Sequence, residues 1–317
     1  MSTTTAIDPR SERIGVLAAA LAAISFGAAF PATAVVLRAY TPLAAAATYS
    51  TIALLLMVGL AVVGVIPRPA PGWATPGALV RLGAVALVGG LGFIVGMSIA
   101  VQLAGATVAG FVATLYSVFS AILAVPILGE RLTPTAFGSF VLALVGTALL
   151  ADPGSLHGSV EGVVIALGAA LCFGLYLVYA RKWAGYPGMG GSSMALAVLV
   201  GRGPLLVLIE LVREPAALAP SGVDLPVLLA MAYLAIVPGG LAQVFILIST
   251  RRIAARRTSA WLLLTPLTSA TLALLLLGET PTALQLAGGT LVVLGIMGAS
   301  GAADEIGRWR ARRRAPA

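Results

Sequence analysis

Long apolar runs alternate with short breaks of proline, glycine and charged residues along almost the whole chain. An apolar run of about 20 residues is long enough to cross a bilayer as a helix. Thr-Pro pairs end at Pro42, Pro134 and Pro281, and each favours a helix start there, because an N-cap residue precedes a proline whose missing N–H costs nothing. The pattern predicts ten helices, over residues 13–38, 44–66, 78–102, 106–128, 134–151, 159–184, 192–213, 225–250, 257–277 and 281–301.

Composition places these helices in a membrane. Of the 317 residues, 60% are hydrophobic and 9% are charged, and the mean hydropathy is +1.05. Soluble domains average about 25% charged residues, so this chain could not cover its own core in water. We therefore expect an all-α integral membrane protein with ten transmembrane helices. The first run is too long for the core of a cleaved signal peptide, which indicates an uncleaved first helix.

The basic residues predict the orientation. With a cytoplasmic N-terminus, 16 of the 19 basic residues fall on the cytoplasmic side, as the positive-inside rule requires. Both termini are then cytoplasmic, with a tail at residues 1–12 and a basic tail at 302–317. We expect a multi-pass plasma-membrane protein, in a bacterial inner membrane. The net charge of +8 reflects these loops and contacts with lipid headgroups, and it does not indicate nucleic-acid binding.

An internal repeat relates the two halves of the chain. A shift of 149 residues aligns Leu128-Gly129-Glu130 with Leu277-Gly278-Glu279, and a shift of 147 aligns Phe26-Gly27 with Phe173-Gly174. The repeats span residues 13–151 and 159–301 and hold five helices each. Because five is odd, the second repeat is inverted relative to the first. Inverted repeats are typical of secondary transporters, whose substrate site lies between the halves.

These landmarks resemble the drug/metabolite transporter superfamily, specifically ten-helix exporters built from two EamA domains. The resemblance covers about residues 13–300 and is strongest over residues 251–279, which include Pro266 and a closing Leu-Gly-Glu. The first repeat departs from the family pattern, because Tyr116 and Ser117 stand where the second has Thr265 and Pro266. The resemblance implies export of amino acids or other small metabolites, and some members of the superfamily carry nucleotide sugars.

Other function classes fit the residues less well. The chain has one cysteine and one histidine, and no paired carboxylates or glycine-rich phosphate loop with lysine. We therefore expect no enzyme activity, metal or cofactor, and transport that is secondary or facilitative. The expected partners are a small-molecule substrate and membrane lipids, and the protein is expected to be a monomer or a homodimer. A flippase for lipid-linked sugars and a non-transporting scaffold stay open as alternatives.

The candidate substrate-binding residues are polar or aromatic side chains within the apolar runs. Arg202 is either a structural or snorkelling charge or an anchor for a substrate carboxylate or phosphate. Gln243 either bonds a neighbouring helix or contacts substrate. The aromatic residues either pack ordinarily or line a cavity for an amphipathic solute. They are Phe26, Phe30, Tyr49, Tyr116, Phe173, Tyr176 and Trp261.

Further residues are expected to shape the bundle. Glu130 and Glu279, at opposite membrane faces, are predicted to hold a helix junction beside the N-terminus of the following helix, or alternatively to form gates. Trp73, Tyr186 and Trp309 are expected at the membrane surfaces. Prolines within helices permit kinks that alternating access could use. These helix-kink candidates are Pro31, Pro204, Pro238 and Pro266.

Overall fold

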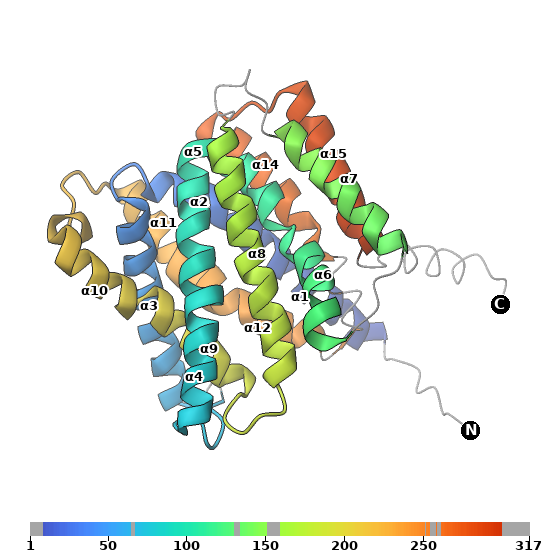
Figure 1. The fold of residues 1–317 in the computed structure, drawn as a ribbon. Coiled ribbons are helices and arrows are strands. Elements are labelled where there is room, and N and C mark those ends of the chain that lie inside the picture. Colours follow the sequence, from blue (N-terminus) through green and yellow to red (C-terminus); the bar gives the residue numbers. More distant parts are fainter. Residues whose placement is uncertain are drawn as a thin grey trace, which may run out of the picture.

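The computed structural model describes residues 9–64, 67–129, 134–150, 159–250, 252–253, 258 and 261–299. Within these ranges every regular element is a helix and no β-strand occurs (Figure 1). Six helical stretches there are long and apolar enough to cross a membrane, and four shorter apolar helices accompany them. The protein is thus an all-helical, multi-pass membrane protein.

The first half of the chain forms helices that are interrupted at glycines and before prolines. Thr41 caps α3 by accepting a hydrogen bond from Ala44 N at 3.3 Å. Gly105, at φ +80°, interrupts α5, and Gly129, at φ +71°, ends α6. The elements are α1 (Pro9–Gly27), α2 (Ala29–Val36), α3 (Pro42–Val62), α4 (Pro76–Val85), the π-helix η1 (Ala86–Gly92), α5 (Phe93–Ala113), α6 (Tyr116–Leu128) and α7 (Pro134–Leu150).

The second half repeats several of these features. A π-helix again contains a glycine pair, Gly239-Gly240, as η1 contains Gly89-Gly90. Gly278 ends α14 at φ +71° and ψ 17°, and Gly129 ends α6 at φ +71° and ψ 18°. The elements are α8 (Val160–Trp183), α9 (Gly191–Arg202), α10 (Pro204–Arg213), the 3₁₀-helix η2 (Pro215–Leu218), α11 (Leu225–Ile236), the π-helix η3 (Val237–Leu241), α12 (Ala242–Thr250), α14 (Leu264–Leu277) and α15 (Ala283–Ala299).

The span expected over 192–213 is present as Gly191–Arg213, but it is not one continuous helix. It is broken into α9 and α10 at Gly203, whose φ and ψ are −98° and −90°. The break has a local cause, because Pro204 has no N–H to donate and disfavours helical backbone in the residue before it. Arg202 therefore ends a helix instead of lying inside one.

The prolines expected to kink helices lie near such irregularities. Pro31 and Pro266 are the third residues of α2 and α14, and the helical pattern is interrupted just before each of these helices begins. Pro204 opens α10 and Pro238 lies in η3. A proline ring disturbs the helical turn before it, which accounts for these positions. A role in transport stays a prediction.

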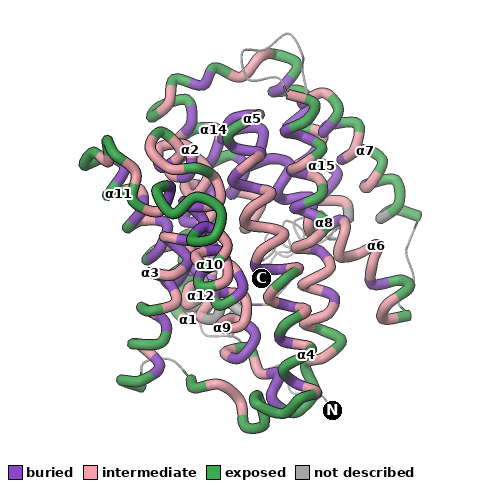
Figure 2. The backbone as a smooth tube through the Cα atoms, turned by 60° about the vertical axis from the view of Figure 1, so that its left-hand side comes forward, coloured by how far each residue is buried: buried purple, intermediate pink, exposed green. Residues whose placement is uncertain are grey.

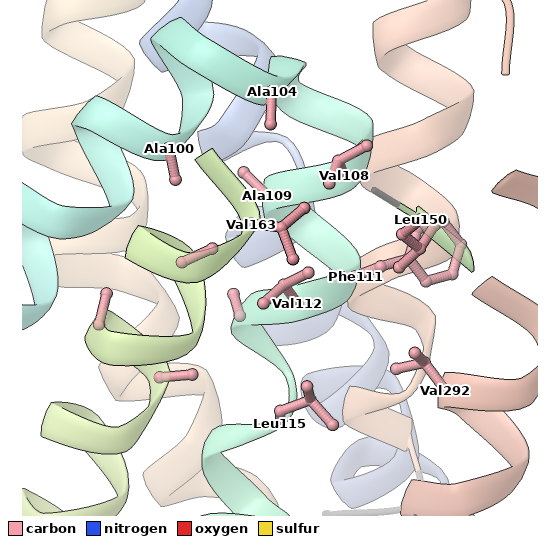
Figure 3. Close-up of a cluster of buried hydrophobic side chains, with 14 of the residues drawn as sticks. Ala100, Ala104, Val108, Ala109, Phe111, Val112, Leu115, Leu150, Val163 and Val292 are labelled. Atoms are coloured by element: carbon pink, nitrogen blue, oxygen red, sulfur yellow. The ribbon is translucent and has the colours of Figure 1, made fainter. Parts of the chain in front are cut away.

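Helix α5 lies at the centre of the main core. On both sides of Gly105 it buries small side chains, among them Ala100, Ala104, Val108 and Val112 (Figure 3), and Val163 of α8 packs against them. Such small and β-branched side chains let helices approach closely without a hydrophobic driving force from lipid. Figure 2 shows buried positions gathered inside the bundle, whereas outer helices such as α7 and α11 carry exposed ones.

Helices α7 and α15 run side by side at one edge of the bundle (Figure 1). A Cβ added at Gly146 would lie 2.5 Å from Gly288 O, and one added at Gly295 would lie 2.6 Å from Ser139 O. Both glycines therefore permit direct contact of the two helix backbones.

Candidate functional site

Arg202 lies inside the bundle at the break between α9 and α10. A Cβ added to the adjacent Gly203 would lie 3.0 Å from Thr51 N and 3.1 Å from Ser50 C, so the break is packed directly on α3. The Nε atom of Arg202 is buried and has no hydrogen-bond partner among the described residues. A guanidinium at such depth is costly unless an anion or a polar partner faces it.

Polar side chains of neighbouring helices surround this guanidinium. Tyr49 of α3 is buried, with 5% of its surface exposed, and interacts electrostatically with Arg202 and with the side chain of Ser98 on α5. Tyr176 of α8 is also within electrostatic range of Arg202. The hydroxyl of Ser50 is buried and has no partner in the described part of the chain. Two buried polar atoms of this region, Nε of Arg202 and Oγ of Ser50, therefore have no hydrogen-bond partner among the described residues.

An aromatic cluster continues from Tyr176 into the bundle. The ring of Phe173 lies 5.2 Å from that of Tyr176, 4.6 Å from Phe93 and 5.0 Å from Tyr116, the last pair at 81°. An added Cβ at Gly89 would lie 2.5 Å from the Tyr176 ring, so the π-helix η1 approaches this ring closely. Helices α5, α6 and α8 thus bring four aromatic rings together near one cation. An amphipathic anion matches both parts.

Glu279 holds together helices that are far apart in sequence. Its carboxylate, 8% exposed, accepts hydrogen bonds from Ala106 N at 2.9 Å, Thr107 N at 3.0 Å and Thr107 Oγ1 at 2.8 Å. Glu279 lies between α14 and α15 as expected, but its carboxylate binds a helix N-terminus in α5 and not the start of the following helix. Gly105, at φ +80°, exposes a new helix N-terminus within α5, and its free N–H groups and positive dipole end take the carboxylate.

Comparison with known proteins shows which family shares this sequence. A model of the EamA-like transporter family matches residues 13–151 and 160–301. The chain belongs to the EamA-like transporter family. It is 29% identical over 181 residues to a protein of Streptantibioticus cattleyicolor named "Probable terminal-alkyne amino-acid exporter"; this match spans 57% of the chain and 59% of that protein's length.

The fold also has a solved counterpart. A structure described as "Crystal structure of protein" is 22% identical to this EamA-family chain and has a TM-score of 0.61, with 94% of this chain and 98% of that chain covered. At this identity the likeness concerns the fold alone. The helical arrangement of Figure 1 is therefore one that a crystal structure also contains.

The candidate residues of this EamA protein lie partly inside the cluster and partly outside it. The structure brings together Tyr49, Tyr116, Phe173, Tyr176 and Arg202, as described above. Phe30 has no ring contact with the described rings of this cluster, although it packs against the same core as Phe93 and Tyr116. Trp261 is 37% exposed, and Phe26 is half-buried on α1. The side chain of Gln243 and the whole of Glu130 lie outside the described residues.

Three residues of the cluster have no counterpart in the sequence-based candidate set. They are Ser50, Phe93 and Ser98. Ser50 follows Tyr49 in a polar interruption of an apolar run, and such an interruption could have indicated that Ser50 faces the interior of the bundle. Phe93 and Ser98 carry none, because a phenylalanine or serine in an apolar helix is common and only the tertiary fold directs it inward.

Two loops contact each other at one end of the bundle. A Cβ added at Gly188 would lie 2.6 Å from the carbonyl carbon and oxygen of Gly72, and Ala70 N donates to Ser193 Oγ at 2.9 Å. Arg81 lies over the Tyr186 ring, with 3.9 Å from its guanidinium carbon to the ring centroid. The contact of Gly72 with Gly188 joins loop 67–75 of the first half to loop 184–190 of the second, while Ser193 belongs to α9 and Arg81 to α4. Trp73 and Tyr186 are exposed there, and Trp309 lies outside the described residues.

Proposed function

We propose that this protein exports amino acids or related amphipathic solutes by alternating access between two inverted repeats, residues 13–151 and 159–301. The observation that carries the proposal is the buried Nε of Arg202, which has no partner among the described residues. A substrate carboxylate would supply the missing anion, and charge-assisted hydrogen bonds of this kind are short and strong. The adjoining rings, from Tyr176 to Tyr116, would hold the apolar part of the solute.

The amino-acid class has separate support. The Streptantibioticus cattleyicolor relative is named as an amino-acid exporter. An amino acid carries a carboxylate and, in many cases, an apolar side chain, which together match Arg202 and the aromatic cluster. A facilitative mechanism is consistent with this site, in which the substrate's own gradient drives transport.

Contacts that interchange between the halves support the inverted repeat. A Cβ at Gly27 would meet Thr265 O, and a Cβ at Gly174 would meet Tyr116 O. Residues 116 and 265 differ by 149, which is the shift that aligns the repeats. Each Phe-Gly landmark thus packs on the fourth helix of the opposite repeat.

The pair α7 and α15 obeys the same relation. The contact between Gly146 and Gly288 becomes, after a shift of 149 in opposite directions, the contact between Gly295 and Ser139. A two-fold axis between the halves produces such exchanged pairs. We further propose that all ten apolar segments, six long and four short, cross the membrane. Both termini then lie on the basic, cytoplasmic side of a bacterial inner membrane.

Alternating access would open and close the two ends of the bundle in turn. In this conformation the loop contacts of Gly72 with Gly188 and of Ala70 with Ser193 close one end. By the distribution of basic residues this is the cytoplasmic end. Export would require these contacts to separate, so that solute from the cytoplasm reaches Arg202.

Exchange in proteoliposomes tests the proposal. Wild-type protein is offered labelled amino acids, nucleosides, sugar derivatives and lipid-linked sugars, and we expect exchange of amino acids. Arg202→Gln should abolish most of it, whereas Arg213→Gln, which changes an exposed arginine of α10, should leave it intact. Exchange of none of the water-soluble solutes by the wild type would contradict the proposal, and movement of lipid-linked sugars alone would indicate a flippase.

A further inference from the structure

A hollow of about 410 Å³ lies on the outside of the bundle, between α3, α4 and α9. Its walls are apolar and include Leu54, Leu79, Leu196 and Val200. The hydroxyl of the lining residue Ser193 already accepts a hydrogen bond from Ala70 N. The hollow contains none of the residues around Arg202, so it is separate from the proposed substrate site.

The hollow opens on a face that contacts hydrocarbon. Leu79 and Val200, on its walls, are 48% and 49% exposed, and the neighbouring Val80 and Leu87 are 74% and 54% exposed. In a membrane protein such surfaces are solvated by lipid chains, because no water is present to disfavour them. An apolar recess on this face is therefore filled from the bilayer, and its occupant is an acyl chain.

One end of the hollow has the chemistry of a headgroup site. Pro69 and Trp73 of loop 67–75 line this end, and Trp73 is 47% exposed, as expected of an indole at the membrane surface. Arg68, which precedes Pro69 in the same loop, is also exposed. An arginine at the headgroup level attracts anionic lipids by about 1 kcal/mol, so a neutral lipid would lose this contribution.

We propose that the hollow between α3, α4 and α9 binds an acyl chain of an anionic phospholipid, whose headgroup contacts Arg68 and Trp73. Loop 67–75 also carries Gly72, which contacts Gly188 of the opposite half. A lipid held between this loop and α9 therefore stabilises the closed end of the bundle. Lipid binding here is independent of which solute is transported.

A glycine pair gives a matched test of the acyl site. Gly83 lines the hollow and Gly168 lies on the exposed side of α8; a Cβ added at either meets no heavy atom within 4 Å. The Cβ of Gly83→Trp therefore has room at the wall of the hollow, and its indole takes up space that an acyl chain would use, whereas Gly168→Trp adds the same side chain elsewhere on the lipid-facing surface. Purified full-length variants are titrated with dioleoyl phosphatidylglycerol or dioleoyl phosphatidylcholine, and bound lipid is counted by native mass spectrometry.

We expect the wild type and Gly168→Trp to bind phosphatidylglycerol and to gain thermal stability from it, and Gly83→Trp to lose both effects. Arg68→Gln, a surface change that leaves the hollow intact, should weaken phosphatidylglycerol binding about fivefold and leave phosphatidylcholine binding unchanged. Arg213→Gln is its control. The proposal is overturned if phosphatidylglycerol binds Gly83→Trp as it binds Gly168→Trp, or if Arg68→Gln has no effect.

Discussion

The contact of Glu279 with the interrupted helix α5 predicts a large effect from a one-atom change. Oε1 accepts from Ala106 N, and Oε2 accepts from both Thr107 N and Thr107 Oγ1. Glu279→Gln keeps the shape but replaces one acceptor by a donor. Its best orientation directs the amide oxygen at Thr107 and leaves Ala106 N facing an NH₂ group, so one buried donor loses its partner.

The loss can be sized from these contacts. A hydrogen bond to a charged group contributes about 1.5–3 kcal/mol, and leaving its donor buried without a partner costs a similar amount. We expect the midpoint of thermal unfolding in detergent to fall by roughly 5 °C, because each kcal/mol shifts it by about 2–4 °C in domains of roughly 150–250 residues and by less in a longer chain.

Glu214→Gln is the control, because Glu214 is an exposed carboxylate outside the helices. Thr107→Val removes only the Oγ1 donor. Its effect should be non-additive with Glu279→Gln, because both changes act on one site, and additive with Glu214→Gln, which lies elsewhere. If Glu279→Gln unfolded at the same temperature as Glu214→Gln, the carboxylate would not be holding this junction.

Other contacts predict further outcomes. Gly188→Ala should disturb the closed end, because this residue has φ +85° and its Cβ would overlap Gly72. Increased labelling of a cysteine introduced at Met189, which is 1% exposed, in the otherwise cysteine-free Cys172→Ser protein would measure the opening, and unchanged labelling would argue against a gate. Gly27→Ala should destabilise the protein by about 1–3 kcal/mol through overpacking against Thr265. Gly59→Ala, in open space on α3, should be neutral, and equal thermal midpoints for the two would contradict the close helix contact.

The sequence could predict the class of protein and part of the site. An all-helical membrane protein follows from the apolar runs alone, and Arg202 is conspicuous because it is a charge within one of them. Pro204 indicates a helix break at Gly203, but the long apolar run around it favours one continuous helix, so the break could not be predicted from this run. The π-helices around Gly90 and Gly240 could not be predicted, because a glycine pair is compatible with several backbone conformations.

Long-range partners were the other part that the sequence could not supply. Glu279 was recognisable as a helix-end carboxylate, but helix N-termini are numerous, and only the fold selects the one at Ala106. Phe93 and Ser98 likewise join the cluster through the packing of α5 and not through any local pattern. In an apolar bundle, a residue's neighbours on other helices decide its role. Hydrophobic periodicity does not reveal which helix face points inward, because most faces are apolar.

The central claim is that Arg202 selects a carboxylate while the aromatic cluster holds an apolar side chain. The most direct measurement compares exchange of phenylalanine with exchange of phenylethylamine, its decarboxylated analogue, in proteoliposomes. We predict that the wild type prefers phenylalanine by roughly 10- to 150-fold, corresponding to about 1.5–3 kcal/mol for hydrogen bonds to a charged group, and that Arg202→Gln loses this preference. Equal exchange of the two compounds by the wild type, or an undiminished preference in Arg202→Gln, would contradict the account.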